Sequence, residues 1–463
     1  MISLRFDKLA AITGGTLSNT EEASKMFAGV AIDSRSKCDG KLFVAIRGPQ
    51  NDGHNYISSA IDKGASGIVA EFNFPNLERI PMDVPVVKVH NSHEAMLTMA
   101  SYYRDRSRAR FVAITGSNGK TTSRELTYQL LSAVEPYSYR SPGNLNNLYG
   151  VPLAIFGMPS DTKVAVLELG ISTKSEMPRL AEIVRPQMVV ITNVAPSHIE
   201  FLSSVEDVAQ AKLQLVSAAD DSVPVIINAD DAVLVRETHK IRDNVITFGM
   251  EMKSDFQPDE VTTQKSGETF VVIEGNQFRL SLVGRHQVYN LLAAYTVCRT
   301  LGYSFNNIDT ENILLATEPM RGQRVKYKGI DFVIDCYNAN PVSMYAGIEA
   351  FFTLQTSHRR VLILGDMLEL GTEAVRYHRE TGRMISNYDF DLAITVGPLA
   401  KFIAQEAKAN GVTSDRLLYF NSAAECETEI EKLLQSDDLV YLKASRGIGL
   451  EAVLNPFSRE END

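Results

Sequence analysis

The sequence predicts an α/β fold built from three domains, and the chain length, the strand pattern and one glycine-rich loop all support this prediction. At 463 residues the chain is longer than one hydrophobic core usually serves, so two or three domains are expected. Hydrophobic residues make up 44% and charged residues 22%, which is typical of a globular protein. Short apolar stretches alternate with helical stretches along the chain, as they do where helices cover a parallel sheet.

The first segment is predicted to hold short strands and one helix. We expect a helix at 56–65 and strands at 28–33, 41–46, 66–71 and 84–89. The charged stretch 102–110 then leads into the next apolar strand. We therefore expect a small α/β N-terminal domain at 1–104.

The middle segment carries strands that are apolar throughout. They are predicted at 111–115, 164–169, 188–194 and 223–228. Such runs belong to parallel strands that are buried on both faces. We expect a central mononucleotide-binding domain at 105–316, with a mostly parallel sheet.

A new series of strands begins after residue 316. The predicted strands are 332–338, 360–366, 392–397 and 439–447, and a helix is expected at 373–387 between them. This pattern predicts a second doubly wound sheet, again mostly parallel, in a Rossmann-like C-terminal domain at 317–463.

Charge and cysteine content exclude several classes of protein. The net charge is -11 and no Lys/Arg-rich block occurs, so we expect no nucleic-acid partner. No apolar run approaches the roughly 18 residues of a membrane span, and the first residues lack a signal-peptide pattern. The four cysteines form no CxxC pair, which argues against a disulfide framework or a structural zinc site. We expect a cytoplasmic monomer that binds no membrane.

The loop TGSNGKTT (115–122) stands between a predicted strand and a predicted helix, where it can bind phosphate. Glycines let backbone N–H groups turn inward, and the N-terminal end of the next helix attracts anions. Lys120 would reach the β- and γ-phosphates of a nucleotide, and the Thr121 hydroxyl would bind Mg²⁺. Ile114 stands where the longer form of this motif has glycine, so the loop is a shortened form. The expected nucleotide-binding residues are Gly116, Asn118, Gly119, Lys120, Thr121 and Thr122.

This loop alone leaves the activity open. A strand-to-helix turn can contain glycines and a lysine without binding anything. A phosphate loop fits a GTPase, a kinase, a motor or a ligase equally well.

Two residues near predicted strand ends of the middle segment can carry chemistry. Glu168 lies near the carboxyl end of a buried strand, where a carboxylate is costly unless it meets a cation such as Mg²⁺. His198 follows another strand, but on spacing alone it is an ordinary loop residue. Lys212 lies on a predicted helix at 204–219, and on spacing alone it is a solvated lysine.

Two polar clusters suit hydrogen bonding to a ligand. The amides Asn144, Asn146 and Asn147 stand close together in NLNNLYGVP (144–152). In the third segment, DCYNANPVSM (335–344) places Asp335, Tyr337, Asn338 and Asn340 at a strand end. An ordinary turn rich in Asn and Pro that binds no ligand would have the same sequence pattern.

Taken together, these stretches resemble the Mur ligases, ATP-dependent enzymes that build the peptide of the bacterial cell-wall precursor. Residues 33–65 are similar to the family's uridine-nucleotide-binding start. The loop 115–122 is similar to its ATP loop, shortened in the same way. GRHQVYNLLAA (284–294) resembles the family's Gly-x-His-Asn-x-x-Asn-x-Leu-Ala-Ala, with Gln287 in place of the first Asn.

Three further stretches, 146–156, 335–344 and 364–371, resemble the family member that adds D-Ala-D-Ala to UDP-MurNAc-tripeptide. The resemblance implies that the tripeptide carboxylate attacks the γ-phosphate of ATP, and that the amine of D-Ala-D-Ala then displaces phosphate from the acyl phosphate. The product would be the UDP-MurNAc-pentapeptide of peptidoglycan. Ser172 and Thr173 depart from the Asn-His of that subfamily, so we assign them no role.

The resemblance also implies roles for individual residues. Lys120, Lys212 and His198 would be catalytic. Thr121 and Glu168 would hold a first Mg²⁺, and His198 together with a carbamylated Lys212 would hold a second. The nucleotide would face Asn290, Arg321 and Asp335. Ser34 and Arg35 would bind the uridine nucleotide, and the other expected substrate-binding residues are Asn144, Asn146, Asn147, Tyr337 and Asn338.

Three alternatives stay open at this stage. A ligase that adds the third amino acid would share the fold and chemistry and differ in its acceptor. A folylpolyglutamate synthase resembles the family in the middle domain but would not need the nucleotide-sugar-like start. A phosphate-loop nucleotide switch would hydrolyse nucleotide without any amino-acid acceptor.

Overall fold

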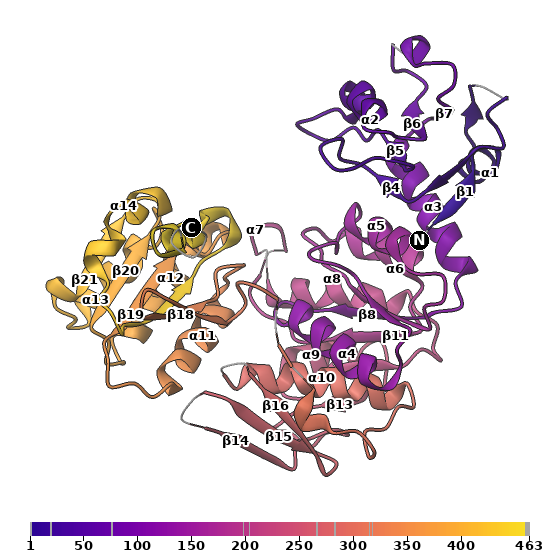
Figure 1. Cartoon of the computed structure of the whole chain (residues 1–463). Coiled ribbons are helices and arrows are strands. Elements are labelled where there is room, and N and C mark those ends of the chain that lie inside the picture. Colours follow the sequence, from indigo (N-terminus) through magenta and orange to yellow (C-terminus); the bar gives the residue numbers. More distant parts are fainter. Residues whose placement is uncertain are drawn as a thin grey trace.

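The computed structural model describes residues 2–18, 21–75, 77–197, 199–202, 204–264, 267–281, 284–313, 315–316 and 318–458. It confirms the predicted three-part α/β fold class. The N-terminal and C-terminal parts lie on different sides of the central part (Figure 1). No helix in the described ranges is both long and apolar enough to cross a membrane, and all four cysteines are buried and free.

The N-terminal part contains a five-stranded sheet in the order β2-β7-β6-β5-β4, in which only β2 is antiparallel to its neighbour. The predicted strand 28–33 is split, because Gly29 turns the chain with a φ of 87° between two short strands. The strands are β1 (Ser3–Arg5), β2 (Thr16–Leu17), β3 (Met26–Ala28), β4 (Val30–Ala31), β5 (Leu42–Val44), β6 (Gly67–Glu71) and β7 (Val86–Val89). The helices are α1 (Phe6–Thr13), η1 (Gly53–Tyr56), α2 (Ile57–Asp62), η2 (Leu77–Arg79) and α3 (Ser92–Arg106).

The central part contains a six-stranded parallel sheet in the order β13-β12-β11-β8-β10-β9. The four predicted strands are its buried centre. Its strands are β8 (Arg110–Thr115), β9 (Ser138–Arg140), β10 (Val164–Glu168), β11 (Met188–Ile191), β12 (Val225–Asn228) and β13 (Ile246–Phe248). Its helices are α4 (Lys120–Val134), α5 (Gly150–Gly157), α6 (Glu176–Val184), α7 (Ile199–Leu202), α8 (Val205–Ser217), α9 (Ala232–Thr238), α10 (His286–Thr300) and the 3₁₀ turn η3 (Thr310–Asn312).

An antiparallel three-stranded sheet in the central part was not predicted. It consists of β14 (Glu260–Thr263), β15 (Thr269–Ile273) and β16 (Asn276–Leu280). Burial alternates along β15, so only one face of this sheet is apolar. That face packs on α10 through Val271 and Phe278, which share a hydrophobic cluster with Tyr295.

The C-terminal part contains a second six-stranded sheet in the order β17-β18-β22-β19-β20-β21, in which only β17 is antiparallel. The predicted strands and the helix 373–387 are confirmed. The strands are β17 (Gln323–Tyr327), β18 (Ile330–Ile334), β19 (Arg360–Gly365), β20 (Leu392–Val396), β21 (Leu417–Phe420) and β22 (Leu439–Lys443). The helices are α11 (Pro341–Thr353), η4 (Gly371–Glu373), α12 (Ala374–Ile385), α13 (Lys401–Ala409), η5 (Ser414–Arg416), α14 (Ala423–Leu433), η6 (Arg446–Ile448), η7 (Leu450–Leu454) and α15 (Asn455–Ser458).

The two large sheets direct their strand ends toward one cavity. The chain reverses its direction of winding beside β8, whose neighbours are β10 and β11, and ligands of open α/β sheets bind at such a point. Residues that follow β8, β10 and β11 line the cavity on one side. Residues that follow β18, together with Lys443 at the end of β22, line it on the other.

Candidate active site

Two positions of the loop between β8 and α4 have room for glycine only. Gly119 caps α4 with a φ of 78°, and a Cβ there would lie 2.2 Å from Oδ1 of Asn290. A Cβ on Gly116 would lie 1.9 Å from Oγ1 of Thr192. The loop therefore runs tightly between β11 and α10, and the N-terminal end of α4 opens into the cavity.

Lys120 is held at the start of α4 by the loop itself. Its Nζ donates to the carbonyl oxygens of Gly116, at 2.8 Å, and Ser117, at 3.3 Å. Burial lowers the pKa of Lys120, and Arg321 acts in the same direction while Glu168 opposes them. An anion in the cavity would offset this lowering, as a phosphate group does.

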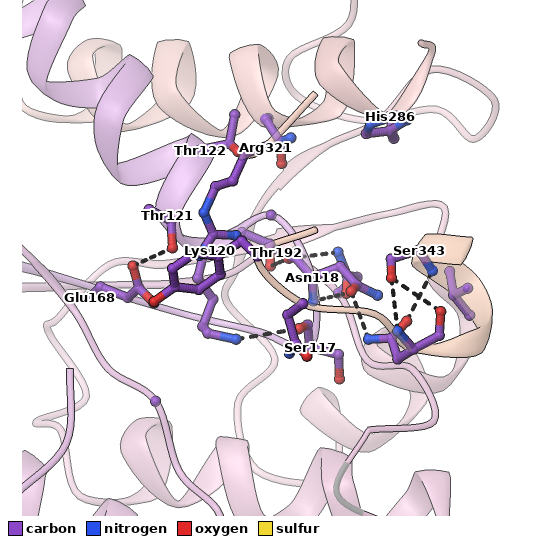
Figure 2. A pocket seen from close by; sticks show the side chains of 18 of the residues that line it. Ser117, Asn118, Lys120, Thr121, Thr122, Glu168, Thr192, His286, Arg321 and Ser343 are labelled. Carbon is purple, nitrogen blue, oxygen red and sulfur yellow. Dashed lines mark hydrogen bonds between the residues drawn. The ribbon is translucent and has the colours of Figure 1, made fainter. Parts of the chain in front are cut away.

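Asn118 keeps a buried donor for a ligand. Its backbone N–H donates to Oδ1 of Asn193 at 2.9 Å, and its carbonyl accepts from the Thr192 hydroxyl at 2.6 Å (Figure 2). Its Nδ2 is buried and has no partner among the residues that the structure describes. A buried amide donor is costly without an acceptor, and a phosphate oxygen would supply one.

Glu168 lies at the end of β10 and is held as a carboxylate. Its Oε2 accepts from the Thr121 hydroxyl at 2.7 Å (Figure 2). Its Oε1 accepts from Nδ2 of Asn146 at 2.8 Å. Burial alone would raise the pKa of Glu168, but Lys120, Arg321 and Arg124 together lower it. A hydroxyl and a carboxylate are donors that Mg²⁺ prefers. In the described ranges no three His, Cys, Asp or Glu residues gather into a complete metal site.

Asn290 faces the loop from α10. Its Oδ1 accepts from the Ser123 hydroxyl at 3.2 Å, and its Nδ2 donates to Oε1 of Gln287 at 2.9 Å. Gln287 replaces the first Asn of the motif Gly-x-His-Asn-x-x-Asn, and its side-chain oxygen accepts the hydrogen bond from Asn290. Burial lowers the pKa of the adjacent His286 to about 4, so this imidazole is neutral near pH 7.

The opposite wall of the cavity comes from the C-terminal part. Asp335 accepts from Nζ of Lys443 and, at 3.1 Å, from the Tyr441 hydroxyl. The guanidinium of Arg321 lies 4.0 Å from the centre of the Tyr337 ring. These contacts place charges of both signs opposite the phosphate loop.

The cavity has a volume of about 530 Å³. It brings together most of the residues predicted from the sequence, on elements far apart in the chain. The predicted residues that line it are Asn118, Gly119, Lys120, Thr121, Thr122, Asn146, Asn147, Glu168, Asn290, Arg321, Asp335, Tyr337 and Asn338.

Lys212 lies in α8 and is only 2% exposed, so its interpretation as a solvated lysine is wrong. The error arose because α8 is buried on more than one face, with Ala211 and Leu213 on either side of the lysine also buried. Burial and the charge of Lys120 set the pKa of Lys212 well below its ordinary value. The predicted His198 lies outside the described residues.

Three other predicted residues lie away from this cavity. Ser34 is buried in the N-terminal part, and its carbonyl accepts from Nζ of Lys63 at 2.7 Å. The exposed Arg35 pairs with Asp33, and this hydrogen bond lowers the pKa of Asp33 to about 2. Asn144 is exposed, while Oδ1 of the neighbouring Asn147 accepts from the backbone N–H of Gly150, at 2.9 Å, where α5 begins.

Sequence reasoning missed Arg124 and Lys443. Lys443 ends β22 in a stretch already predicted as a strand, so the strand-end rule that found Asp335 could have found it. Arg124 follows the phosphate loop by one helical turn, and nothing in its spacing marks it. Its side chain is fully buried.

Comparison with known proteins assigns all three parts of the chain to one family. Residues 27–104 match the model "Mur ligase family, catalytic domain", residues 114–298 match "Mur ligase middle domain", and residues 320–446 match "Mur ligase, glutamate ligase domain". The UDP-N-acetylmuramoyl-tripeptide–D-alanyl-D-alanine ligase of Bacillus subtilis (strain 168) is 31% identical over 98% of each chain.

Solved structures agree with this. The structure of MurF ligase from Thermotoga maritima in complex with ADP is 27% identical, with a TM-score of 0.79 over 94% of this chain and 97% of that one. The fold is also that of MurF from Acinetobacter baumannii, which is 23% identical, with a TM-score of 0.85 over 99% of this chain and 100% of that one.

Proposed function

The chain belongs to the Mur ligase family, and we propose that it joins D-Ala-D-Ala to UDP-MurNAc-tripeptide in an ATP-dependent reaction. The product is the UDP-MurNAc-pentapeptide used to build peptidoglycan. The observation that carries this proposal is the single cavity that holds Lys120, Thr121 and Glu168 on one wall and Asp335 and Lys443 on the other.

The phosphate loop holds ATP for attack by the tripeptide carboxylate. Lys120 and the unpartnered Nδ2 of Asn118 contact phosphate oxygens, and Asn290, Arg321 and Asp335 face the rest of the nucleotide. The carboxylate oxygen attacks the γ-phosphorus, the bond to the bridging oxygen breaks, and ADP leaves. The amine of D-Ala-D-Ala then attacks the acyl carbon, loses a proton, and expels phosphate. The protein contributes position and charge neutralisation to both steps.

Two Mg²⁺ sites belong to this proposal. Thr121 and Glu168 would hold one ion, which would supply charge stabilisation to the transferred phosphoryl group. His198 and a carbamylated Lys212 would hold the other. The buried amine of Lys212 supports carbamylation, because its lowered pKa favours the neutral form that reacts with CO₂.

Other residues serve the remaining substrates. Ser34 and Arg35 bind the uridine nucleotide, and Asn146, Asn147, Tyr337 and Asn338 bind the substrates near the reacting centre. Asn144, which lies outside the cavity, is a further substrate-binding residue. The five-stranded sheet and the two six-stranded sheets support domains at 1–104, 105–316 and 317–463, one for each substrate group. We propose that the enzyme acts as a cytoplasmic monomer.

The deciding experiment measures ATP-dependent phosphate release with UDP-MurNAc-tripeptide, with and without D-Ala-D-Ala. Release that requires both substrates, with formation of the pentapeptide, is the expected result. Release with UDP-MurNAc-dipeptide and a single amino acid would indicate the third-residue ligase instead. Release indifferent to any acceptor would indicate a nucleotide switch.

A further inference from the structure

Arg124 makes contacts that the proposed reaction does not yet use. It lies in α4, one turn after Thr121, and its side chain is 0% exposed. Its Nη1 donates to the carbonyl of Gly143 at 2.6 Å and lies 3.4 Å from Oε2 of Glu168. Its Nη2 contacts Oε1 of Glu318. One guanidinium thus meets two carboxylates that are 150 residues apart in the sequence.

The first carboxylate belongs to the active site. Oε2 of Glu168 accepts from Thr121 and also lies against Arg124. Gly143, the other acceptor of Arg124, belongs to the loop that supplies Asn146, whose Nδ2 holds Oε1 of Glu168. Arg124 therefore supports Glu168 both directly and through this loop.

The second carboxylate belongs to the segment that enters the C-terminal part. Gln129 of the same helix α4 binds Ala316 twice, by Nε2 to the carbonyl at 3.0 Å and by Oε1 from the backbone N–H at 3.1 Å. Glu318 follows, and three residues later Arg321 reaches the cavity. The chain before β17 is thus fastened to α4 at Gln129 and at Arg124, immediately before Arg321.

We propose that Arg124 is a positioning residue that fixes Glu168 and, through Glu318, Arg321 in one arrangement around the nucleotide phosphates. This inference rests on the proposed function and extends it, because Glu168 is a proposed Mg²⁺ ligand and Arg321 is proposed to face the nucleotide. Arginine suits this task, since its planar fork presents separate N–H donors to two acceptors, whereas lysine presents one point charge. Displacement of a group at the reacting centre by about 1 Å can reduce a rate by about a hundredfold.

The test compares Arg124→Gln, Arg124→Lys and Glu318→Gln. For each variant the dissociation constant of ADP with Mg²⁺ is measured by calorimetry, alongside kcat and KM for ATP. We expect Glu318→Gln and Arg124→Gln each to weaken ADP binding about tenfold, a usual size for coupling between sites. Arg124→Lys should recover part of this loss. The double variant should be no worse than Arg124→Gln, because the two residues act as one unit.

Arg321→Ala reveals whether the effect passes through Arg321. In that background Glu318→Gln should cause no further loss of ADP binding. A full additional loss would overturn the proposal, as would wild-type ADP binding in Glu318→Gln alone.

Arg140→Gln is the matched control. Nε of Arg140 lies 2.6 Å from Oε2 of Glu125, so this variant also removes an ion pair from α4 but touches neither Glu168 nor Glu318. We expect it to change ADP binding by less than about twofold. A loss equal to that of Arg124→Gln would show a general effect of α4 and overturn the proposal. If Arg124→Gln does not fold, Glu318→Gln decides, since Glu318 is 21% exposed. ADP binding requires no acceptor substrate. The ADP measurements therefore test the role of Arg124 independently of the experiment that asks whether phosphate release requires D-Ala-D-Ala.

Discussion

Nδ2 of Asn340 donates to Oδ1 of Asn118 at 2.7 Å, which joins the first turn of α11 to the phosphate loop. Asn340 also caps α11, since its Oδ1 accepts from the backbone N–H of Ser343 at 2.9 Å and the Ser343 hydroxyl accepts in return. The same side chain therefore stabilises a helix and links the two walls of the cavity. The hydrogen bond from Asn340 to Oδ1 also fixes the orientation of the Asn118 amide, and therefore of its Nδ2.

Asn340→Ser and Asn340→Ala separate these two roles. Serine is a good N-cap but is too short to donate to Asn118, so Asn340→Ser should keep its unfolding free energy and raise KM for ATP. Alanine should add a loss of about 1 kcal/mol in stability, because it cannot cap the helix. Chemical denaturation and ATP kinetics check both statements. Wild-type KM in the serine variant would show that the link to Asn118 is irrelevant to nucleotide binding.

Lys120→Met should reduce kcat/KM for ATP about a thousandfold, the usual effect of removing a charge that stabilises a transferred phosphoryl group. Stability should hold or rise, since a partly buried ammonium is removed. Lys174→Met removes an exposed lysine that pairs with Asp207 and serves as the control. Comparable losses in both variants would contradict a specific role for Lys120.

Lys212→Met should abolish ligation and increase stability. Its pKa in the folded protein lies well below the ordinary 10.5, so between these two values the unfolded chain binds more protons than the folded one. The unfolding free energy of the unmodified wild type therefore rises with pH in that window, and the advantage of Lys212→Met should shrink toward pH 10.5. Denaturation over a pH series checks this.

The carbamate itself has a separate test. Lys212→Ala should regain part of its phosphate release when short carboxylates are added, and wild type equilibrated with ¹³C-bicarbonate should give a carbamate carbon signal that Lys212→Ala lacks. Full activity of Lys212→Ala without any additive would rule out the second metal site as proposed.

Arg35→Ala should affect only the nucleotide sugar. The Arg35 side chain is 90% exposed and pairs with an exposed Asp33, so its removal should change stability by less than about 0.5 kcal/mol. We expect KM for UDP-MurNAc-tripeptide to rise about tenfold, as for the loss of one charge-assisted hydrogen bond, with KM for ATP unchanged. An equal rise in both KM values would place Arg35 outside the uridine-nucleotide site.

The sequence predicted those parts of the fold in which local pattern and tertiary environment agree. The strands at 111–115 and 164–169 are apolar because both faces are covered, and the glycines of the loop mark positions where the backbone has a positive φ. The sheet of β14, β15 and β16 was missed because one of its faces is polar and its strand β14 is exposed. Its pattern resembles that of surface loops.

Site residues at strand ends could be predicted from the sequence. Site residues that depend on burial in a helix could not. Glu168 and Asp335 stand at strand ends, a position that topology makes functional. Arg124 and Lys212 stand on helices, and only the packing of the surrounding chain buries side chains that are usually exposed. The resemblance to a family, rather than any spacing, drew attention to Lys212.

The close contacts at Gly116 and Gly119 also limit how this protein can vary. Gly119 lines the cavity, where a small side chain would ordinarily be harmless, yet both glycines have a positive φ, and a Cβ on either would clash with a side-chain oxygen behind the loop. In a library selected for growth, both positions should retain glycine alone. Gly143 has a φ of 53°, and a Cβ there would meet nothing within 4 Å, so this position should accept asparagine or aspartate. Substitution of Gly116 or Gly119 is therefore not an available route to resistance against a ligand that binds in the cavity.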